Sequence, residues 1–268
     1  MDICEEAIAF ARDMYIAKYH SSFGFEENLN IYKNLPAFKA CENIHELHTR
    51  GDLPDSEELF VKDDFSMKPE VHWIMRSITQ YYLTEAFKAM KIDLTDSNVA
   101  VNALGKGTPG RIAKMWLGND PEDTTELGSG RWNKQPYIST FPNTDKNHSV
   151  ITKRVDIVSC CSHHFLPFST LGNGVATISY IPREFVLGIS KLQRFVNWAA
   201  RRFWLQEDLT QYIGKMLIQV AETPDVYVRL ENLVHGCEKY RGAESHDGCL
   251  TTEFKNGYFS KSKNILTE

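Results

Sequence analysis

Apolar residues recur every three or four positions in several stretches of the chain, and this spacing predicts helices that have one apolar face. One such stretch begins the chain at residues 3–14, and another covers residues 68–90. Two more lie close together in the second half, over residues 192–203 and 209–220. Because an apolar helix face is buried in a folded protein, we expect these helices to cover a core.

Apolar and polar residues alternate in four other segments of the second half, and this pattern predicts strands. The segments are residues 149–160, 174–181, 225–235 and 249–259. Gly172, Asn173 and Gly174 supply a turn between the first two strands. With the two helices between the second and third strands, the predicted order is β-β-α-α-β-β. This order predicts an α+β fold, an antiparallel sheet with both helices on one face.

The glycine-rich segment 105–116 invites comparison with a phosphate-binding loop, but it lacks the residue order of that loop. Thr108 and Pro109 instead predict the start of a helix, with threonine as the cap and proline in the first helical position. Arg111 then falls in the first turn of that helix.

The composition is that of an ordinary globular protein of 268 residues, 42% of them hydrophobic and 24% charged. Its six cysteines are too few for a disulfide scaffold, which favours thiol or metal chemistry in a reducing compartment. The net charge of −5 argues against nucleic acid as a partner, so an anionic ligand would need a local cluster of Lys and Arg. No apolar run approaches the about 20 residues of a membrane span. The first residues lack the basic start of a signal peptide. We therefore expect a cytoplasmic protein without a membrane partner.

We divide the chain into an extension over residues 1–66, mostly helix and loop, and a main domain over residues 67–268. The extension contains His45 and His48, whose spacing is one residue short of a metalloprotease motif, so we interpret them as solvated helix histidines.

The residues that indicate chemistry are cysteines and histidines at the ends of two predicted strands. Cys161 and His164 have the two-residue gap that allows two side chains to reach one metal ion. Cys237 follows another strand, so folding would have to bring it to the pair. Three ligands would leave a fourth zinc position for water, whose pKa would fall to about 7. The alternative is that the cysteines are small buried hydrophobes and the histidines form local hydrogen bonds.

Four motifs in sequence order resemble those of the GTP cyclohydrolase I family. They are TPGRIAKMW at 108–116, Cys-x-His-His-Phe at 161–165, YIPREFVLGISKLQRFVNWAARRFWLQEDLT at 180–210 and VHGCEKYRG at 234–242. The resemblance runs from about residue 67 to the end of the chain. It implies the tunnelling fold, a toroidal homodecamer, and hydrolysis of GTP to formate and 7,8-dihydroneopterin triphosphate, which serves pterin and tetrahydrofolate biosynthesis.

The resemblance also implies a role for each matching residue. The zinc ligands would be Cys161, His164 and Cys237, and the catalytic histidines His163 and His235. His163 would give a proton to the purine, a role that suits a side chain whose pKa is near neutrality. The guanine would be bound by Gln206 and Glu207, and the triphosphate by Arg111, Ser190, Lys191, Arg194 and Arg241, with Arg111 from a neighbouring subunit. Lys191 and Arg194 are three residues apart and would share one helix face.

The sequence departs from the family pattern at Ser162, where glutamate is usual, and at Asp208, where a basic residue is common. Two other functions stay open. One is a non-catalytic nucleotide- or pterin-binding protein with a structural zinc, whose fourth ligand would be Cys160, Cys249 or His235. The other is a cyclohydrolase that stops at the ring-opened formamide.

Overall fold

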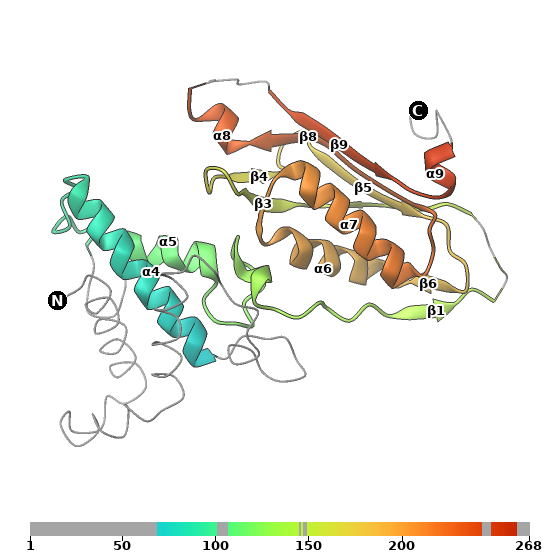
Figure 1. The fold of residues 1–268 in the computed structure, drawn as a ribbon, viewed down its shortest axis with the longest axis horizontal. Helices are drawn as coiled ribbons and strands as arrows, with labels where there is room; N and C mark the ends of the chain where they lie inside the picture. The colour runs from blue at the N-terminus through green and yellow to red at the C-terminus, as the bar shows by residue number, and fades with distance from the viewer. Residues whose placement is uncertain (1–68, 101–106, 145, 147–148, 243–247, 262–268) are drawn as a thin grey trace, which may run out of the picture. The chain divides into compact units, whose positions relative to one another are not determined.

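The computed structural model describes residues 69–100, 107–144, 146, 149–242 and 248–261 (Figure 1). The helix predicted at 3–14 and the pair His45 and His48 lie outside these residues. The chain divides into two compact units, Met1–Lys134 and Gln135–Glu268. The boundary predicted at residues 66 and 67 falls outside the described residues and stays a prediction.

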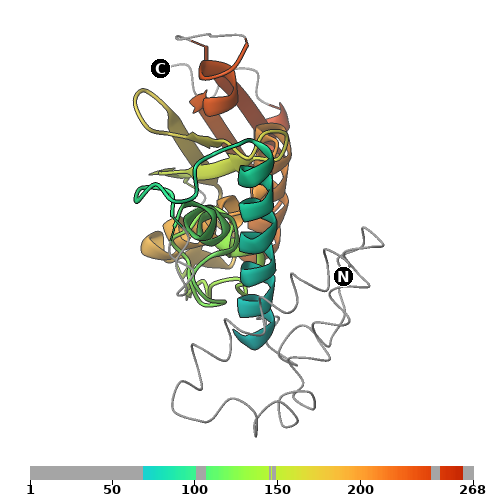
Figure 2. The ribbon, with the colours of Figure 1, turned by 90° about the vertical axis from the view of Figure 1, so that its left-hand side faces the viewer.

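The first unit contains two helices that pack against each other, α4 (Pro69–Ala89) and α5 (Thr108–Leu117), and a short 3-10 helix, η1 (Ser129–Arg131). Figure 2 shows α4 from the side and α5 nearly end-on, so the two helices cross. The buried ring of His72 on α4 makes a hydrogen bond through Nε2 with the carbonyl oxygen of Leu117, at 2.8 Å. No described helix of either unit combines the length and the apolar character that crossing a bilayer requires.

The predicted cap of α5 is wrong by one residue. Gly107 is at the cap position and Thr108 is already helical. The hydroxyl of Thr108 donates to the carbonyl oxygen of Asn98, at 3.3 Å, instead of to the helix. Gly107 has φ +133°, a conformation that side chains rarely adopt, which explains why glycine takes the cap.

The second unit is built on one large sheet. Four strands form an antiparallel set in the order β2-β5-β8-β9, and β4, β3 and β7 continue the sheet beyond β8. Two short strands, β1 and β6, form a separate antiparallel pair. The strands are β1 (Thr140–Pro142), β2 (Ile151–Val155), β3 (Val158–Cys161), β4 (Pro167–Ser169), β5 (Val175–Tyr180), β6 (Phe185–Leu187), β7 (Phe203–Trp204), β8 (Val226–His235) and β9 (Leu250–Lys255).

Helices α6 (Ile189–Ala200) and α7 (Gln206–Ala221) pack on the same face of this sheet (Figure 1). The register brings Ile178 of β5 opposite Val228 of β8, and Val228 opposite Phe254 of β9. These three side chains belong to one buried cluster with the apolar residues of both helices. The core therefore lies between one sheet face and the helix pair.

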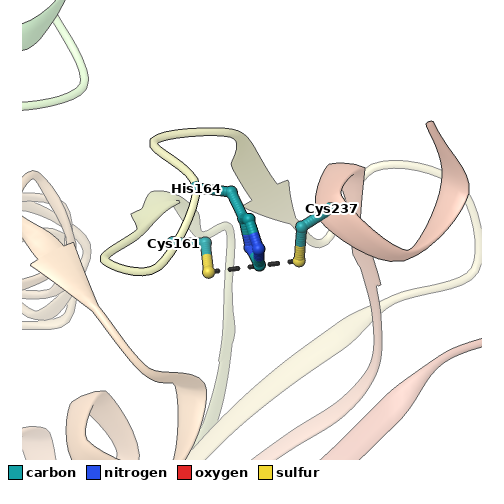
Figure 3. Close-up of side chains that lie close together, drawn as sticks. All are labelled: Cys161, His164 and Cys237. Carbon is teal, nitrogen blue, oxygen red and sulfur yellow. Dashed lines mark hydrogen bonds between the residues drawn. The ribbon is translucent and has the colours of Figure 1, made fainter. Parts of the chain in front are cut away.

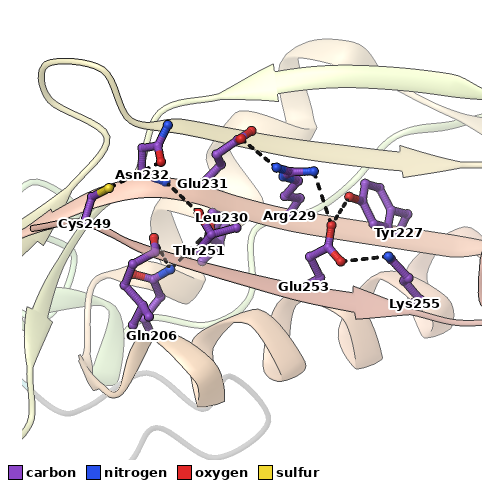
Figure 4. Close-up of polar contacts among 11 residues, drawn as sticks. Gln206, Tyr227, Arg229, Leu230, Glu231, Asn232, Cys249, Thr251, Glu253 and Lys255 are labelled. Atoms are coloured by element: carbon purple, nitrogen blue, oxygen red, sulfur yellow. Dashed lines mark hydrogen bonds and ion pairs between the residues drawn. The ribbon is translucent and has the colours of Figure 1, made fainter. Parts of the chain in front are cut away.

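The opposite face of β8 and β9 carries charged and polar side chains (Figure 4). Glu253 accepts a hydrogen bond from the hydroxyl of Tyr227, at 2.6 Å, and pairs with Lys255, at 2.7 Å. Arg229 pairs with Glu231, at 2.6 Å, and with Glu253, at 3.4 Å. Residues of the two helices do not contribute to this network, because Tyr227 and Arg229 alternate with the buried Val228.

The α+β content and the antiparallel pairing agree with the sequence prediction, but three details were wrong. The strand predicted at 149–160 is interrupted at Asp156 and Ile157, so β2 pairs with β5 while β3 pairs with β4. Side chains satisfy the backbone at this break, because Gln193 accepts from the Asp156 N–H and Thr170 from the Ile157 N–H. Phe203 lies in strand β7, which pairs with β3 in parallel, instead of continuing α6.

The third difference is at the end of the chain. The strand predicted at 249–259 stops at Lys255, and α9 (Tyr258–Lys261) follows. Gly257 between them has φ +58°, which ends the extended backbone. A β-carbon at this position would also meet the carbonyl oxygen of Pro224, at 2.7 Å.

Candidate active site

A tight turn between β3 and β4 brings Cys161 and His164 together. The Cys161 N–H donates to the carbonyl oxygen of Leu166, and the Phe165 N–H donates to that of Cys161, both at 2.8 Å. Phe165 adopts a left-handed conformation with φ +52°, which is uncommon for a bulky residue. Its ring packs edge-on against Phe203, with centroids 4.8 Å apart. The turn is thus closed at both ends and held by an aromatic contact.

Cys237 lies just after the end of β8, next to this turn. Phe168 of β4 lies opposite His235, the last residue of β8, and α8 (Gly236–Lys239) begins immediately after it. A β-carbon at Gly236 would lie 3.1 Å from the carbonyl oxygen of Pro167, so glycine permits the close approach. As a result the sulfurs of Cys237 and Cys161 are 4.0 Å apart, with His164 beside them (Figure 3).

The three side chains fit a zinc ion. Their ligand atoms all lie within 4.8 Å of one another. Two sulfurs that each sit about 2.3 Å from a tetrahedral zinc ion are about 3.8 Å apart, close to the separation of the sulfurs here. The Nδ1 atom of His164 is buried and has no hydrogen-bond partner among the described residues. An unpartnered buried nitrogen beside two thiols is the arrangement that a metal ion would satisfy.

The protonation of His164 also suits a metal. Desolvation, then the positive charge of Arg241, and then His163 lower the pKa of His164, which favours the neutral ring that binds metals. Burial, and then the neighbouring Cys161, raise the pKa of Cys237. Without a cation Cys237 therefore disfavours its thiolate form, and metal binding would release its proton. Arg241 contacts His164 on its other nitrogen, Nε2.

His235 is held by two contacts on different sides of its ring. It stacks on Phe168, with centroids 4.7 Å apart and planes inclined by 7°. Its Nε2 is 2.7 Å from Oε1 of Gln206. Burial lowers the pKa of His235, although the carboxylates of Glu238 and then Glu207 raise it, so the neutral form is favoured. His163 is exposed on the turn, with its ring centroid 6.0 Å from that of His164.

The short strand β7 connects the metal turn to the start of α7. Cys161 lies opposite Trp204 in the parallel pairing, and the Ser162 N–H donates to the carbonyl oxygen of Trp204, at 3.1 Å. The indole of Trp204 donates to the carbonyl oxygen of Ala199, at 2.8 Å. Two residues later α7 begins with Gln206, which is buried, and Glu207, which is exposed. The predicted guanine pair thus follows a strand that is bonded to the metal turn.

The predicted triphosphate residues fall in three places. The first group lies at the start of α6 and consists of Ser190, Lys191 and Arg194. The first turn of this helix has no acidic residue, and no side chain caps its N-terminal end. Helix starts of this kind are favourable for anions. Arg241 follows α8 and contacts the metal cluster through His164. Arg111 lies on α5 in the first unit. No contact found among the described side chains joins the three α6 residues to the metal cluster.

Two residues of the site were missed by the sequence analysis. Phe168 supports the ring of His235, and Trp204 joins β7 to the metal turn. Phe168 lies three residues after the metal motif, and Trp204 lies inside the motif at 180–210, so both could have been selected by position. The partner that each contacts depends on strand pairing, which the sequence pattern did not predict.

Comparisons with known proteins agree on one family. The chain matches the family model described as GTP cyclohydrolase I over residues 84–268. It is 34% identical to GTP cyclohydrolase 1 of Yersinia pseudotuberculosis over 204 residues, 75% of this chain and 84% of that protein. The corresponding enzyme of Klebsiella pneumoniae is 33% identical over 189 residues, 70% and 77% of the two chains. That of Salmonella gallinarum is 32% identical over 195 residues, 72% and 80% of the two chains.

Proposed function

The chain belongs to the GTP cyclohydrolase I family, and from this premise we propose that it hydrolyses GTP at C8, releases formate and forms 7,8-dihydroneopterin triphosphate. The observation that carries the proposal is the group of Cys161, His164 and Cys237, with its unpartnered buried nitrogen. Three protein ligands are the number that a catalytic zinc site uses, whereas a structural site uses four.

Cys161, His164 and Cys237 would hold the zinc ion. When bound in such a site, zinc lowers the pKa of a water molecule to about 7 and supplies a nucleophile at neutral pH. Coordination through Nδ1 places the proton of His164 on Nε2, where it would oppose the N–H of Arg241. The guanidinium of Arg241, which lies beside His164, would serve an anionic ligand next to the metal.

Two histidines would serve the proton transfers. C8 of guanine is a weak electrophile, so a proton given to N7 makes attack by water easier. His163 suits this donation because its ring is exposed on the metal turn, next to a ligand. His235 lies at the end of β8, two residues before Cys237, and would act on the reacting ring from the other strand.

Glu207 would recognise guanine, because a carboxylate can accept hydrogen bonds from N1–H and from the exocyclic amine, and adenine offers neither in this arrangement. Its exposure at the start of α7 and its electrostatic effect on His235 support this role. The triphosphate would be bound by a set of polar and basic side chains, which are Arg111, Ser190, Lys191, Arg194 and Arg241.

The family membership also underlies the remaining parts of the proposal. We expect the tunnelling fold to assemble as a toroidal homodecamer in the cytoplasm, with Arg111 reaching the site of a neighbouring subunit. The α+β sheet, whose edge strands β2 and β9 each have one unpaired side within the described residues, is compatible with such assembly.

The experiment that tests the function incubates zinc-loaded protein with GTP and measures formate, the mass of the organic product and pterin fluorescence after oxidation. We expect formate and the pterin triphosphate in equal amounts. A ring-opened formamide without formate would indicate a cyclohydrolase that stops early. Tight GTP binding with no product would favour the non-catalytic binding protein and overturn the proposal.

The second candidate, a binding protein with a closed structural zinc site, requires a fourth protein ligand. Cys160 is buried. Consecutive residues of a strand face opposite sides of the sheet, so the side chain of Cys160 points away from the side on which its neighbour Cys161 lies. Cys249 contacts Asn232, and His235 contacts Gln206. Among the described residues the ligand group consists of three side chains, so the open site is the arrangement that the geometry favours.

A further inference from the structure

Gln206 is almost completely buried, with 1% of its surface exposed, although it stands at the first position of α7. Its amide nitrogen lies 3.2 Å from the carbonyl oxygen of Leu230, 3.1 Å from that of Leu250, and 3.0 Å from the hydroxyl oxygen of Thr252 (Figure 4). All three partners lie on strands β8 and β9. The amide is therefore enclosed by the sheet on one side.

The direction of these hydrogen bonds can be derived from the partners. A carbonyl oxygen can only accept, so the atom that faces Leu230 and Leu250 is the NH₂ group. The hydroxyl of Thr210 donates to the carbonyl oxygen of Gln206, at 2.8 Å, and its oxygen is 2.7 Å from that of Thr252. Because Thr210 has already donated its one proton, Thr252 donates to Thr210 and accepts from the amide.

The orientation of the amide determines the proton position on His235. With NH₂ toward the sheet, Oε1 is the atom that points to Nε2 of His235, at 2.7 Å. An amide oxygen only accepts, so Nε2 must carry a proton. In the neutral ring the lone pair is then on Nδ1. The stacking on Phe168 fixes the plane of the ring, so both the tautomer and the orientation are set by the protein.

We propose that Gln206 is a positioning residue that holds His235 as the Nε2–H tautomer and leaves Nδ1 to face the reacting ring. The proposal rests on the proposed function, in which His235 acts on the substrate. It differs from the role expected of Gln206 from the family motif, which is direct contact with guanine. A guanine contact would require the amide to leave the carbonyl oxygens of Leu230 and Leu250 and the hydroxyl of Thr252, at the cost of these hydrogen bonds.

The test uses the full-length, zinc-loaded protein with nitrogen-labelled histidine. In the wild-type protein the NMR spectrum should show His235 protonated on Nε2 and unprotonated on Nδ1, with the signals assigned by comparison with His235→Asn. In Gln206→Met the preference for Nε2–H should be lost. A wild-type spectrum with the proton on Nδ1 would overturn the proposal, whether or not the protein turns over GTP.

Kinetics provide the second measurement. A positioning role predicts that Gln206→Met lowers kcat by about 10- to 100-fold, with the KM for GTP within about threefold of wild type. A guanine contact predicts instead a raised KM with kcat little changed, and this result would overturn the proposal. Gln219→Met, the same substitution at an exposed position of α7, is the matched control and should change neither constant.

The formate assay and the NMR spectrum together distinguish failure of the proposed function from failure of the positioning role. If formate is absent from the wild-type reaction but the Nε2–H tautomer is found, the proposed function fails while the role of Gln206 in fixing the ring stands. If formate is produced and the tautomer is Nδ1–H, the function stands and the positioning role fails.

Discussion

The described cysteines differ in environment, and only two of them share a ligand group. Burial, with a smaller contribution from Cys161, raises the pKa of Cys160 to about 12, which keeps this thiol protonated. Cys249 is exposed, and its sulfur is 3.4 Å from Oδ1 of Asn232. Cys161 and Cys237 instead face each other across the ends of two strands. Single substitutions can therefore separate metal binding from general thiol chemistry.

Cys237→Ser should remove the metal and the activity together, because a hydroxyl is a poor zinc ligand compared with a thiolate. We expect zinc content to fall well below one per chain and formate production to fall by about 100-fold or more. Metal analysis and the formate assay measure the two effects. Cys249→Ser is the control and should keep both. Full zinc occupancy in Cys237→Ser would contradict the assigned ligand set.

Glu207→Gln tests recognition of guanine. The amide keeps the shape of the carboxylate but loses its charge and one of its acceptors, so kcat/KM for GTP should fall by about 100-fold. The preference for GTP over inosine triphosphate, which lacks the exocyclic amine, should also shrink. Steady-state kinetics with both nucleotides provide the measurement. The adjacent exposed residue supplies the control, since Asp208→Asn should leave the preference unchanged. Equal losses in both variants would indicate an effect on the helix start alone.

At the scale of the elements, sequence periodicity predicted the long helices and strands well. The stripe over 68–90 corresponds to α4, and the alternation at 225–235 corresponds to β8. The break at Asp156 and the strand β7 were not predictable in this way. Both depend on which strand is the neighbour, and the local pattern of apolar residues contains no information on pairing. An apolar aromatic residue such as Trp204 is compatible with either a helix or a strand, so its type does not indicate which one forms.

The candidate site was predictable in residue identity but not in geometry. Spacing suggested the pair Cys161 and His164, with Cys237 as a third candidate from the end of another strand, and the family resemblance implied that all three bind zinc. The structure brings these three together. The burial of Gln206 could not be derived from sequence, because its polar side chain stands beside exposed acids at a helix start. Its acceptors come from two strands far along the chain, so only the folded arrangement reveals where its amide points.

Helix α7 approaches β9 closely at Gly214. A β-carbon there would overlap the ring of Phe254, which is itself buried and cannot move freely. Gly214→Ala should therefore destabilise the protein by about 1–3 kcal/mol, even though alanine is the better helix former. Denaturant unfolding at fixed protein concentration measures the change. Lys215→Ala, at the next and exposed position, should stay within about 0.5 kcal/mol of wild type. An increase in stability for Gly214→Ala would contradict the packing.

The polar network on the other sheet face should make stability depend on pH. Burial raises the pKa of Glu253, but hydrogen bonds from Lys255 and Tyr227 outweigh it and lower the pKa below its usual value. Such a carboxyl adds stability above the unfolded pKa, about 4.3, and this addition is lost as the pH falls through the folded pKa.

We therefore expect Glu253→Gln to be less stable than wild type at pH 7 and to approach wild type as the pH falls below about 4. Unfolding midpoints in urea at pH 7, 5 and 3.5 would measure the difference. Glu122→Gln, at an exposed position of the first unit, is the control. A constant difference between variant and wild type over this range would exclude the carboxylate as its source.

At the scale of the whole molecule, the family match begins at residue 84, so it does not include the extension over residues 1–66. The metal cluster and both predicted catalytic histidines belong to the second unit, residues 135–268. The family match and the described metal cluster thus lie outside the extension. Its role stays open, and its removal is an informative experiment.

A variant that begins at Met67 should keep its assembly state and its formate production, with turnover within about twofold of the full chain. Light scattering gives the particle mass, which should correspond to ten subunits for both proteins. The formate assay gives turnover. A smaller particle with lost activity would assign the extension to assembly, and a full-sized particle with altered dependence on GTP concentration would assign it to regulation.

Strand β7 also limits how this sequence can change in length. Its two residues link Ser162 on one side to Gln206 and Glu207 on the other, with a single amino acid between Trp204 and the helix. An insertion there would rotate the helix start by about 100° and move both side chains away from His235. By contrast, a β-carbon at Gly172 has open space around it, so extra residues fit there. Insertions and deletions among natural relatives should accordingly accumulate in the turn at Gly172 and be absent between Trp204 and α7.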